Sequence, residues 1–222
     1  MKKEIAVIFD MDGVICDTNP FHAKAFHAFF DKYGISATEE EFQDHMYGKH
    51  NSYILKHFFK KDFTTEEIIK LEEEKEGLFR EIYKGNIEPL PGYMEFLNTL
   101  KSKDIKTAIA TSAPKKNLEL IATELELAPM MQSILYSEKI TKHKPDPEIY
   151  LKTAENLGID PKNSLVFEDS HSGASAGLNA GMKVIGVLST HTKDQLPTCH
   201  YYINDFTEVS WQLVQQILEI DN

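Results

Sequence analysis

The chain has 222 residues, of which 41% are apolar and 27% charged, a composition that is typical of globular proteins and excludes an intrinsically disordered chain. Its formal net charge of −11 disfavours binding to nucleic acid, although a small anionic ligand needs only local positive charge. No stretch approaches the ~18 consecutive apolar residues of a membrane span, and the first apolar run is too short for a signal peptide. We therefore expect a cytoplasmic protein with no membrane or nucleic-acid partner, in which Cys16 and Cys199 are reduced thiols.

The first predicted element is a strand. Residues 5–9 form a continuous apolar run that ends at Asp10, the pattern of a strand buried on both faces of a parallel sheet. Residues 19–85 then read as helices only. Thr38 and Thr64 each stand three residues before a glutamate, and this capping-box spacing predicts two helix starts.

The second of these helices covers residues 64–84, with an apolar stripe that includes Ile69 and Phe79. A segment rich in proline and glycine, residues 88–92, then marks a boundary. We predict an all-α helical cap domain at residues 18–87, inserted into a core domain made of residues 1–17 and 88–222.

After the boundary, strands and helices alternate along the chain. The strands are predicted at residues 105–110, 133–136, 164–167 and 184–187; the helices are predicted at residues 147–157, capped by Asp146, and at 170–180. This alternation predicts an α/β core with a Rossmann-like, doubly wound parallel sheet.

Polar side chains stand at or just beyond the carboxyl ends of the predicted strands: Asp10, Asp12, Thr111, Lys144, Glu168 and Asp169. Ligands of open α/β sheets bind outside the carboxyl ends of the strands, so we expect these side chains to meet at one place. Clustered carboxylates repel one another unless a cation joins them, and hard oxygen ligands favour Mg²⁺.

Each position also has a simpler interpretation. Asp-x-Asp-Gly can begin a calcium loop, but Val14 and Phe21 occupy positions where that loop needs acidic ligands. Asp12 followed by glycine can be a plain turn, Lys144 a solvated lysine and Thr111 a helix N-cap. None of these interpretations explains why all the positions follow successive strands.

Four segments resemble the motifs of the haloacid dehalogenase superfamily: residues 9–15 resemble motif I, Thr111 motif II, residues 144–147 motif III and residues 167–170 motif IV. The helical insertion resembles the small cap of the β-phosphoglucomutase-like and phosphatase branch. The resemblance covers nearly the whole chain.

The resemblance implies a role for each motif residue. Asp10 is the nucleophile that becomes an aspartyl phosphate, and Asp12 is the general acid and base. Asp10, the backbone carbonyl of Asp12 and Asp169 hold Mg²⁺, with Glu168 assisting directly or through water. Thr111 and Lys144 bind the phosphoryl group.

Substrate choice is expected to depend on the cap. The resemblance assigns substrate contacts to Thr18 and His22 at the junction of the domains, to Lys49, His50 and Asn51 in a cap loop, and to Ser112 and Ala113 after motif II. His22 can equally be a boundary histidine of an amphipathic helix, and Lys49 a solvated lysine. In mutase-type relatives the position of Asn51 is an arginine, and a Ser-Lys-Asn run follows motif II. Here the run is Ala113-Pro114-Lys115, although a phosphate site can be rebuilt in a shifted register from Lys49, Lys115, Lys116 and Asn117.

We therefore predict a monomeric phosphatase that transfers the phosphoryl group of a small metabolite, a sugar phosphate, to Asp10 and then to water. The first alternative is a β-phosphoglucomutase that interconverts β-glucose 1-phosphate and glucose 6-phosphate. The second is a non-catalytic member that only binds a ligand or a partner. The sequence does not name the substrate.

Overall fold

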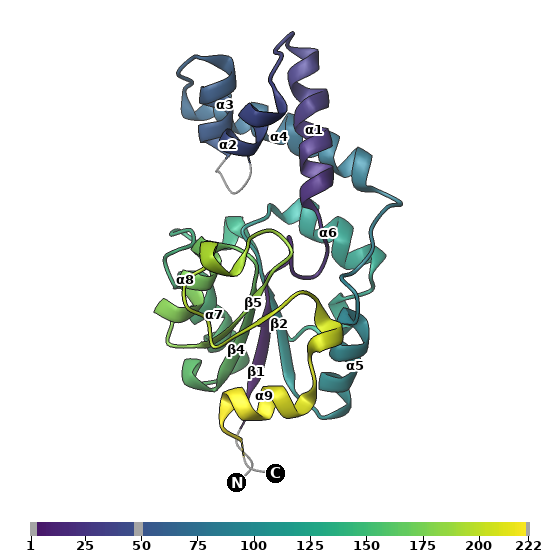
Figure 1. Cartoon of the computed structure of the whole chain (residues 1–222), viewed down its shortest axis with the longest axis vertical. Coiled ribbons are helices and arrows are strands. Elements are labelled where there is room, and N and C mark those ends of the chain that lie inside the picture. The colour runs from purple at the N-terminus through teal and green to yellow at the C-terminus, as the bar shows by residue number, and fades with distance from the viewer. Residues whose placement is uncertain (1–3, 47–50, 221–222) are drawn as a thin grey trace. The chain divides into compact units, whose positions relative to one another are not determined.

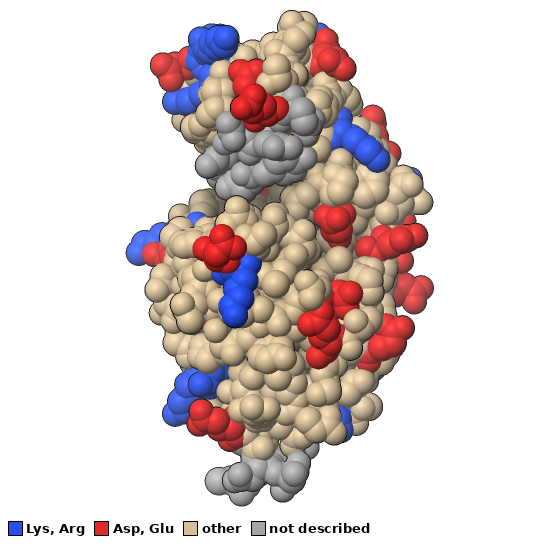
Figure 2. All heavy atoms as spheres, viewed as in Figure 1, with Lys and Arg blue, Asp and Glu red and all other residues tan. Residues whose placement is uncertain are grey.

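The computed structural model describes residues 4–46 and 51–220, apart from the side chains at positions 39, 43 and 44. The chain forms two compact units (Figure 1), which we call the core (Met1–Asp17 and Ile87–Asn222) and the cap (Thr18–Asn86). Within the described ranges, no helix is long and apolar enough to cross a membrane. On the face that Figure 2 shows, acidic side chains gather along one flank of the core, in keeping with the net charge of −11.

The core is built around one parallel sheet of six strands: β1 (Ala6–Phe9), β2 (Lys106–Ala110), β3 (Ser133–Leu135), β4 (Ser164–Glu168), β5 (Lys183–Val187) and β6 (Tyr201–Ile203). Their order across the sheet is β3-β2-β1-β4-β5-β6, the order of doubly wound nucleotide-binding folds. This confirms the predicted fold class and adds a short edge strand, β6, that the sequence pattern did not predict. Because the order reverses at β1, the carboxyl ends of β1 and β4 flank the switch point of the sheet.

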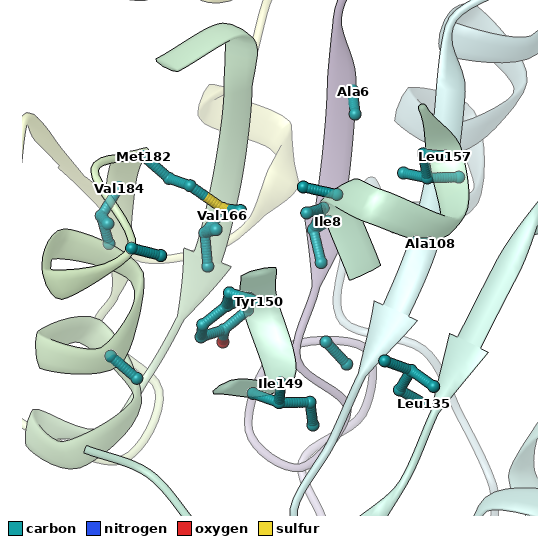
Figure 3. Packing of buried hydrophobic residues seen from close by; sticks show 14 of the residues in the cluster. Ala6, Ile8, Ala108, Leu135, Ile149, Tyr150, Leu157, Val166, Met182 and Val184 are labelled. Atoms are coloured by element: carbon teal, nitrogen blue, oxygen red, sulfur yellow. The ribbon is translucent and has the colours of Figure 1, made fainter. Parts of the chain in front are cut away.

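Helices cover both faces of the sheet (Figure 1): α5 (Tyr93–Ser102), α6 (Lys115–Glu124), α7 (Glu148–Leu157), α8 (His171–Asn179) and α9 (Trp211–Leu218). Side chains alternate between the faces, as expected for strands. Ile8 and Val166 pack with Tyr150 of α7 in one hydrophobic cluster (Figure 3). Phe9 and Phe167 stack on the other face, with ring centroids 5.4 Å apart. Both faces of the sheet are therefore buried.

Two predicted helix starts are placed more accurately by the structure. Helix α7 begins at Glu148 with Pro147 as its N-cap, and Asp146, which was expected to cap it, accepts a hydrogen bond from the Glu148 N–H at 3.0 Å. Helix α8 begins after Ser170, whose hydroxyl accepts from the Gly173 N–H. Short 3₁₀ helices complete the core at Ala128–Met130, Ser137–Lys139, Pro161–Asn163, Lys193–Gln195 and Phe206–Glu208.

The cap consists of helices α1 (Asn19–Lys32), α2 (Glu39–His45), α3 (Asn51–Phe59) and α4 (Thr65–Tyr83). Both predicted capping boxes are present, at Thr38 and at Thr64. Phenylalanines from α1, α2 and α3 form most of its hydrophobic core. The predicted stripe of α4 is wrong at Ile69, which is 57% exposed, whereas Lys75 and Glu76 are buried. Polar contacts inside the cap, described below, account for that burial.

Candidate active site

Adjacent parallel strands bring three carboxylates together. Phe9 pairs with Phe167 in the register of β1 and β4, so Asp10 follows β1 beside Glu168, the last residue of β4, and Asp169. The Asp10 N–H donates to the Phe167 carbonyl at 3.1 Å. Asp10, Glu168 and Asp169 are buried, and each offers an oxygen within 4.8 Å of the others. We call these three residues the acidic cluster.

Lys144 joins two members of the acidic cluster. Its Nζ lies 2.6 Å from Asp10 Oδ1 and 2.6 Å from Glu168 Oε1, and donates to the Ala110 carbonyl at 3.1 Å. The side chain is only 5% exposed. Charge-assisted hydrogen bonds of this kind are short and strong, and little water competes with them here. Lys144 is thus a fixed, buried cation and not a solvated surface lysine.

One lysine does not balance the negative charge of the acidic cluster. Burial raises the pKa of Asp10 to about 8, helped by Glu168 and Asp12 and opposed by Lys144. Burial, followed by repulsion from Glu168 and Asp10, raises the pKa of Asp169 well above its usual value. The pKa of Lys144 lies well above its usual value because attraction to Asp10 and Glu168 outweighs the effect of burial. Further positive charge would lower the carboxylate pKa values, and a buried all-oxygen donor set suits a hard divalent cation such as Mg²⁺.

Glu168 is held on both of its carboxylate oxygens. Oε1 accepts from Lys144 and, at 2.8 Å, from the hydroxyl of Tyr150; Oε2 accepts from the N–H and hydroxyl of Ser170. Gly173 leaves room for this carboxylate, since a Cβ there would lie 1.7 Å from Oε1. Glu168 is therefore fixed by the protein before any ligand binds.

The remaining core candidates lie on the loops after β1 and β2. Asp12 is half-buried in the turn after Asp10. Thr111 is buried directly after β2, where its hydroxyl accepts from the Ala113 N–H at 3.0 Å. Ser112 is exposed and Ala113 is buried. Thr111 does not cap α6, because Pro114 occupies the N-cap position.

Sequence reasoning missed several residues that contact the site. Tyr150 comes from α7, and the centroid of its ring lies 5.0 Å from Lys144 Nζ. After β5, Thr190 donates to Asp169 Oδ2, and Ser189 donates to the Gly13 carbonyl. These last two follow a strand's carboxyl end, so the rule that located Asp10 could have found them. Nothing in the local sequence indicates Tyr150.

In the cap, two of the described candidates, His22 and Asn51, belong to a polar cluster. Thr18 is buried, and its carbonyl accepts from the His22 N–H. His22 Nδ1 lies 3.0 Å from Lys75 Nζ, and Lys75 Nζ lies 2.5 Å from Glu76 Oε1. Asn51 donates to the same Glu76 oxygen at 3.1 Å. A buried lysine–glutamate pair thus joins His22 to Asn51.

Two of the expected cap residues, Lys49 and His50, lie outside the described residues. Their assignment as substrate contacts therefore stays a prediction.

Comparison with known proteins identifies the type of protein. A sequence profile of the haloacid dehalogenase-like hydrolases matches residues 7–187. The phosphorylated carbohydrates phosphatase of Thermotoga maritima is 35% identical over 187 residues, which cover 82% of this chain and 85% of that relative.

Solved structures agree. A HAD hydrolase of family IA, variant 3, from Entamoeba histolytica matches with a TM-score of 0.91 at 29% identity, covering 97% of this chain and 99% of that one. A β-phosphoglucomutase from Clostridium difficile matches with a TM-score of 0.82 at 25% identity, covering 97% of both chains.

Proposed function

The chain belongs to the haloacid dehalogenase-like hydrolases, as the four motifs suggested, and is a phosphohydrolase; we propose that it is a Mg²⁺-dependent phosphatase of small phosphorylated carbohydrates that works through a phosphoaspartate at Asp10. The observation that carries this proposal is the acidic cluster with Lys144 buried against it. The substrate class comes from the relative in Thermotoga maritima, whose name states phosphorylated carbohydrates.

In the first step a carboxylate oxygen of Asp10 attacks phosphorus. The new bond joins Asp10 to the phosphoryl group, and the bond between phosphorus and the sugar oxygen breaks. Asp12 protonates the departing sugar oxygen. In the second step Asp12, now a base, takes a proton from water, whose oxygen attacks phosphorus, releases phosphate and regenerates Asp10.

Positive charge around the phosphoryl group supplies most of the catalysis, because the transition state carries negative charge on its equatorial oxygens. Lys144 is already fixed beside Asp10, so its ammonium group needs little reorganisation to bind a phosphoryl oxygen. Thr111 adds a hydroxyl after the neighbouring strand. Removal of either group should therefore raise the free energy of the transition state more than that of the bound substrate.

Asp10 and Asp169 would hold the Mg²⁺, together with the carbonyl of Asp12 that the resemblance assigns. When bound, the ion neutralises negative charge on the carboxylates and on the phosphoryl oxygens. The oxygens of Glu168 already accept hydrogen bonds from Lys144, Tyr150 and Ser170, which supports a role for Glu168 as the counter-ion of Lys144 that assists the metal through water.

The residue at position 51 favours a phosphatase over a mutase. A mutase must hold a sugar with two phosphates, and its second phosphate needs a cationic site. Asn51, where mutase-type relatives have an arginine, is uncharged and donates to the carboxylate of Glu76, which Lys75 already neutralises. Position 51 therefore supplies no cation for a second phosphate. The mutase stays the second candidate because of the structural similarity to a β-phosphoglucomutase.

The test is a phosphate-release screen across sugar phosphates, with pyrophosphate and nucleotides as comparison substrates and Asp10→Asn as the control. We expect the fastest turnover with a sugar phosphate, and no turnover in chelator. With β-glucose 1-phosphate and catalytic bisphosphate, free phosphate should exceed glucose 6-phosphate. Faster formation of glucose 6-phosphate would establish the mutase instead, and no turnover of any phosphate ester would indicate a non-catalytic member.

A further inference from the structure

The loop after β5 contacts motifs I and IV at once. The Thr190 hydroxyl donates to Asp169 Oδ2, and His191 Nδ1 lies 3.1 Å from the Asp169 carbonyl, to which it donates. The preceding residue, Ser189, donates to the carbonyl of Gly13, in the turn that follows Asp10. Three consecutive side chains thus hold the turn after Asp10, at Gly13, and both the carboxylate and the backbone of Asp169.

The Thr190 contact is enclosed by the motif I turn. A Cβ built on Gly13 would lie 2.0 Å from Asp169 Oδ2 and 2.7 Å from Thr190 Oγ1. The glycine therefore leaves space for both the carboxylate and the hydroxyl that binds it. Such a close approach restricts the positions that the Asp169 carboxylate can occupy.

The neighbouring carboxylates repel the Asp169 carboxylate. Asp169 is buried, and Glu168 and Asp10 each offer an oxygen within 4.8 Å of one of its own. Without a hydrogen-bond donor this carboxylate would turn away from the two like charges. A hydroxyl that donates to one of its oxygens fixes its direction.

We propose that Thr190 is a positioning residue, which holds the Asp169 carboxylate in the direction needed to bind Mg²⁺ and thereby raises the affinity of the acidic cluster for the ion. This inference rests on the proposed function, because it takes Asp169 as a metal ligand. Removal of hydrogen-bond partners behind metal ligands typically costs about 10–100-fold in metal affinity.

The experiment is calorimetric titration of the full chain with Mg²⁺ alone, without substrate. Thr190→Val keeps the shape of the side chain and removes the donor, so we expect affinity to fall about 10–100-fold. Thr190→Ser keeps the donor and should bind Mg²⁺ within about threefold of the wild type, a difference of about 0.7 kcal/mol or less. Thr198→Val makes the same substitution at an exposed threonine and should leave affinity unchanged.

Steady-state assays of the same variants add a second readout. The Mg²⁺ concentration that gives half-maximal activity should rise in Thr190→Val by the factor measured in the titration, whereas a merely structural role would lower the unfolding temperature without this shift. If Thr190→Val does not fold, Thr190→Ala makes the same comparison. Wild-type Mg²⁺ affinity in a folded Thr190→Val overturns this inference alone. A wild-type protein that does not bind Mg²⁺ overturns the proposed metal site and this inference with it.

Discussion

Replacing Gly13 by alanine tests whether the acidic site needs the close approach of its motif I turn. Gly13 has a φ of +72°, and an added Cβ would lie 2.0 Å from Asp169 Oδ2, about 1 Å short of the 3.0 Å that Cβ atoms require. Either the carboxylate or the turn must move. Both carry groups that the proposed mechanism uses.

The magnitude has two parts. An L-residue in the left-handed region costs about 1–2 kcal/mol, which for a chain of this size lowers the unfolding temperature by about 2–8 °C. Displacement of a catalytic group by about 1 Å costs about 10²-fold in rate, equivalent to ~2.7 kcal/mol. Gly181 separates the two parts, since it has a φ of +75° and nothing within 4 Å of an added Cβ.

The assay measures kcat/KM for an aryl phosphate at several Mg²⁺ concentrations, together with thermal unfolding. Gly13→Ala and Gly181→Ala should both lose stability, and only Gly13→Ala should lose about 10²-fold or more in kcat/KM and bind Mg²⁺ more weakly. A Gly13→Ala protein within threefold of wild-type kcat/KM would refute the reasoning. So would an equal loss of activity in Gly181→Ala.

The other predictions concern side chains that hold the site. Tyr150→Phe removes one hydrogen-bond donor from Glu168 while the ring stays packed. It should lower kcat by about 2–13-fold, which corresponds to a lost hydrogen bond of about 0.5–1.5 kcal/mol, and an unchanged kcat would contradict that role. Glu148 accepts from two backbone N–H groups of the loop that carries Lys144, so Glu148→Gln should raise KM and lower kcat, whereas an effect on stability alone would exclude positioning of the loop. Hydrogen bonding from Lys152 and from this loop lowers the pKa of Glu148 to about 2. Its stabilising contribution is therefore complete above a pH of about 4.5 and is lost as the pH falls toward 2, which acid unfolding of wild type and Glu148→Gln will compare.

The sequence predicts the central strands because a strand buried on both faces is a continuous apolar run. This is why residues 5–9 and 164–167 are recognisable without any structure. Strand β6 is only three residues long and lies at the edge of the sheet, with Tyr201 exposed, so it carries no such run. Helix α9, at Trp211–Leu218, was also not predicted from the pattern.

Some residues of the site can also be predicted from the sequence, and others cannot. Asp10, Glu168 and Asp169 converge because neighbouring parallel strands end at one edge of the sheet. Their positions at the ends of apolar runs are therefore enough to predict that they meet. Contacts of Tyr150 with Glu168 depend on how α7 packs on the sheet, which periodicity does not give. In the cap, Lys75 and its neighbour Glu76 look like solvent-facing charges of a helix, and only the partners that bury them indicate otherwise.

The central claim is that phosphate passes through Asp10, and the most direct measurement is acid quenching of the enzyme during turnover, followed by mass spectrometry of the peptide that contains Asp10. Asp12→Ala should slow release of the phosphoryl group, because no base remains to activate water, and with an activated aryl phosphate the phosphoenzyme should accumulate. We predict a single phosphoryl group on Asp10 in this variant, its absence from Asp10→Asn, and a fall of at least ~10³ in kcat for Asp10→Asn with the fold intact. A folded Asp10→Asn protein with near-normal turnover, or an active Asp12→Ala protein that binds Mg²⁺ and carries no phosphoryl group on Asp10, would contradict the mechanism.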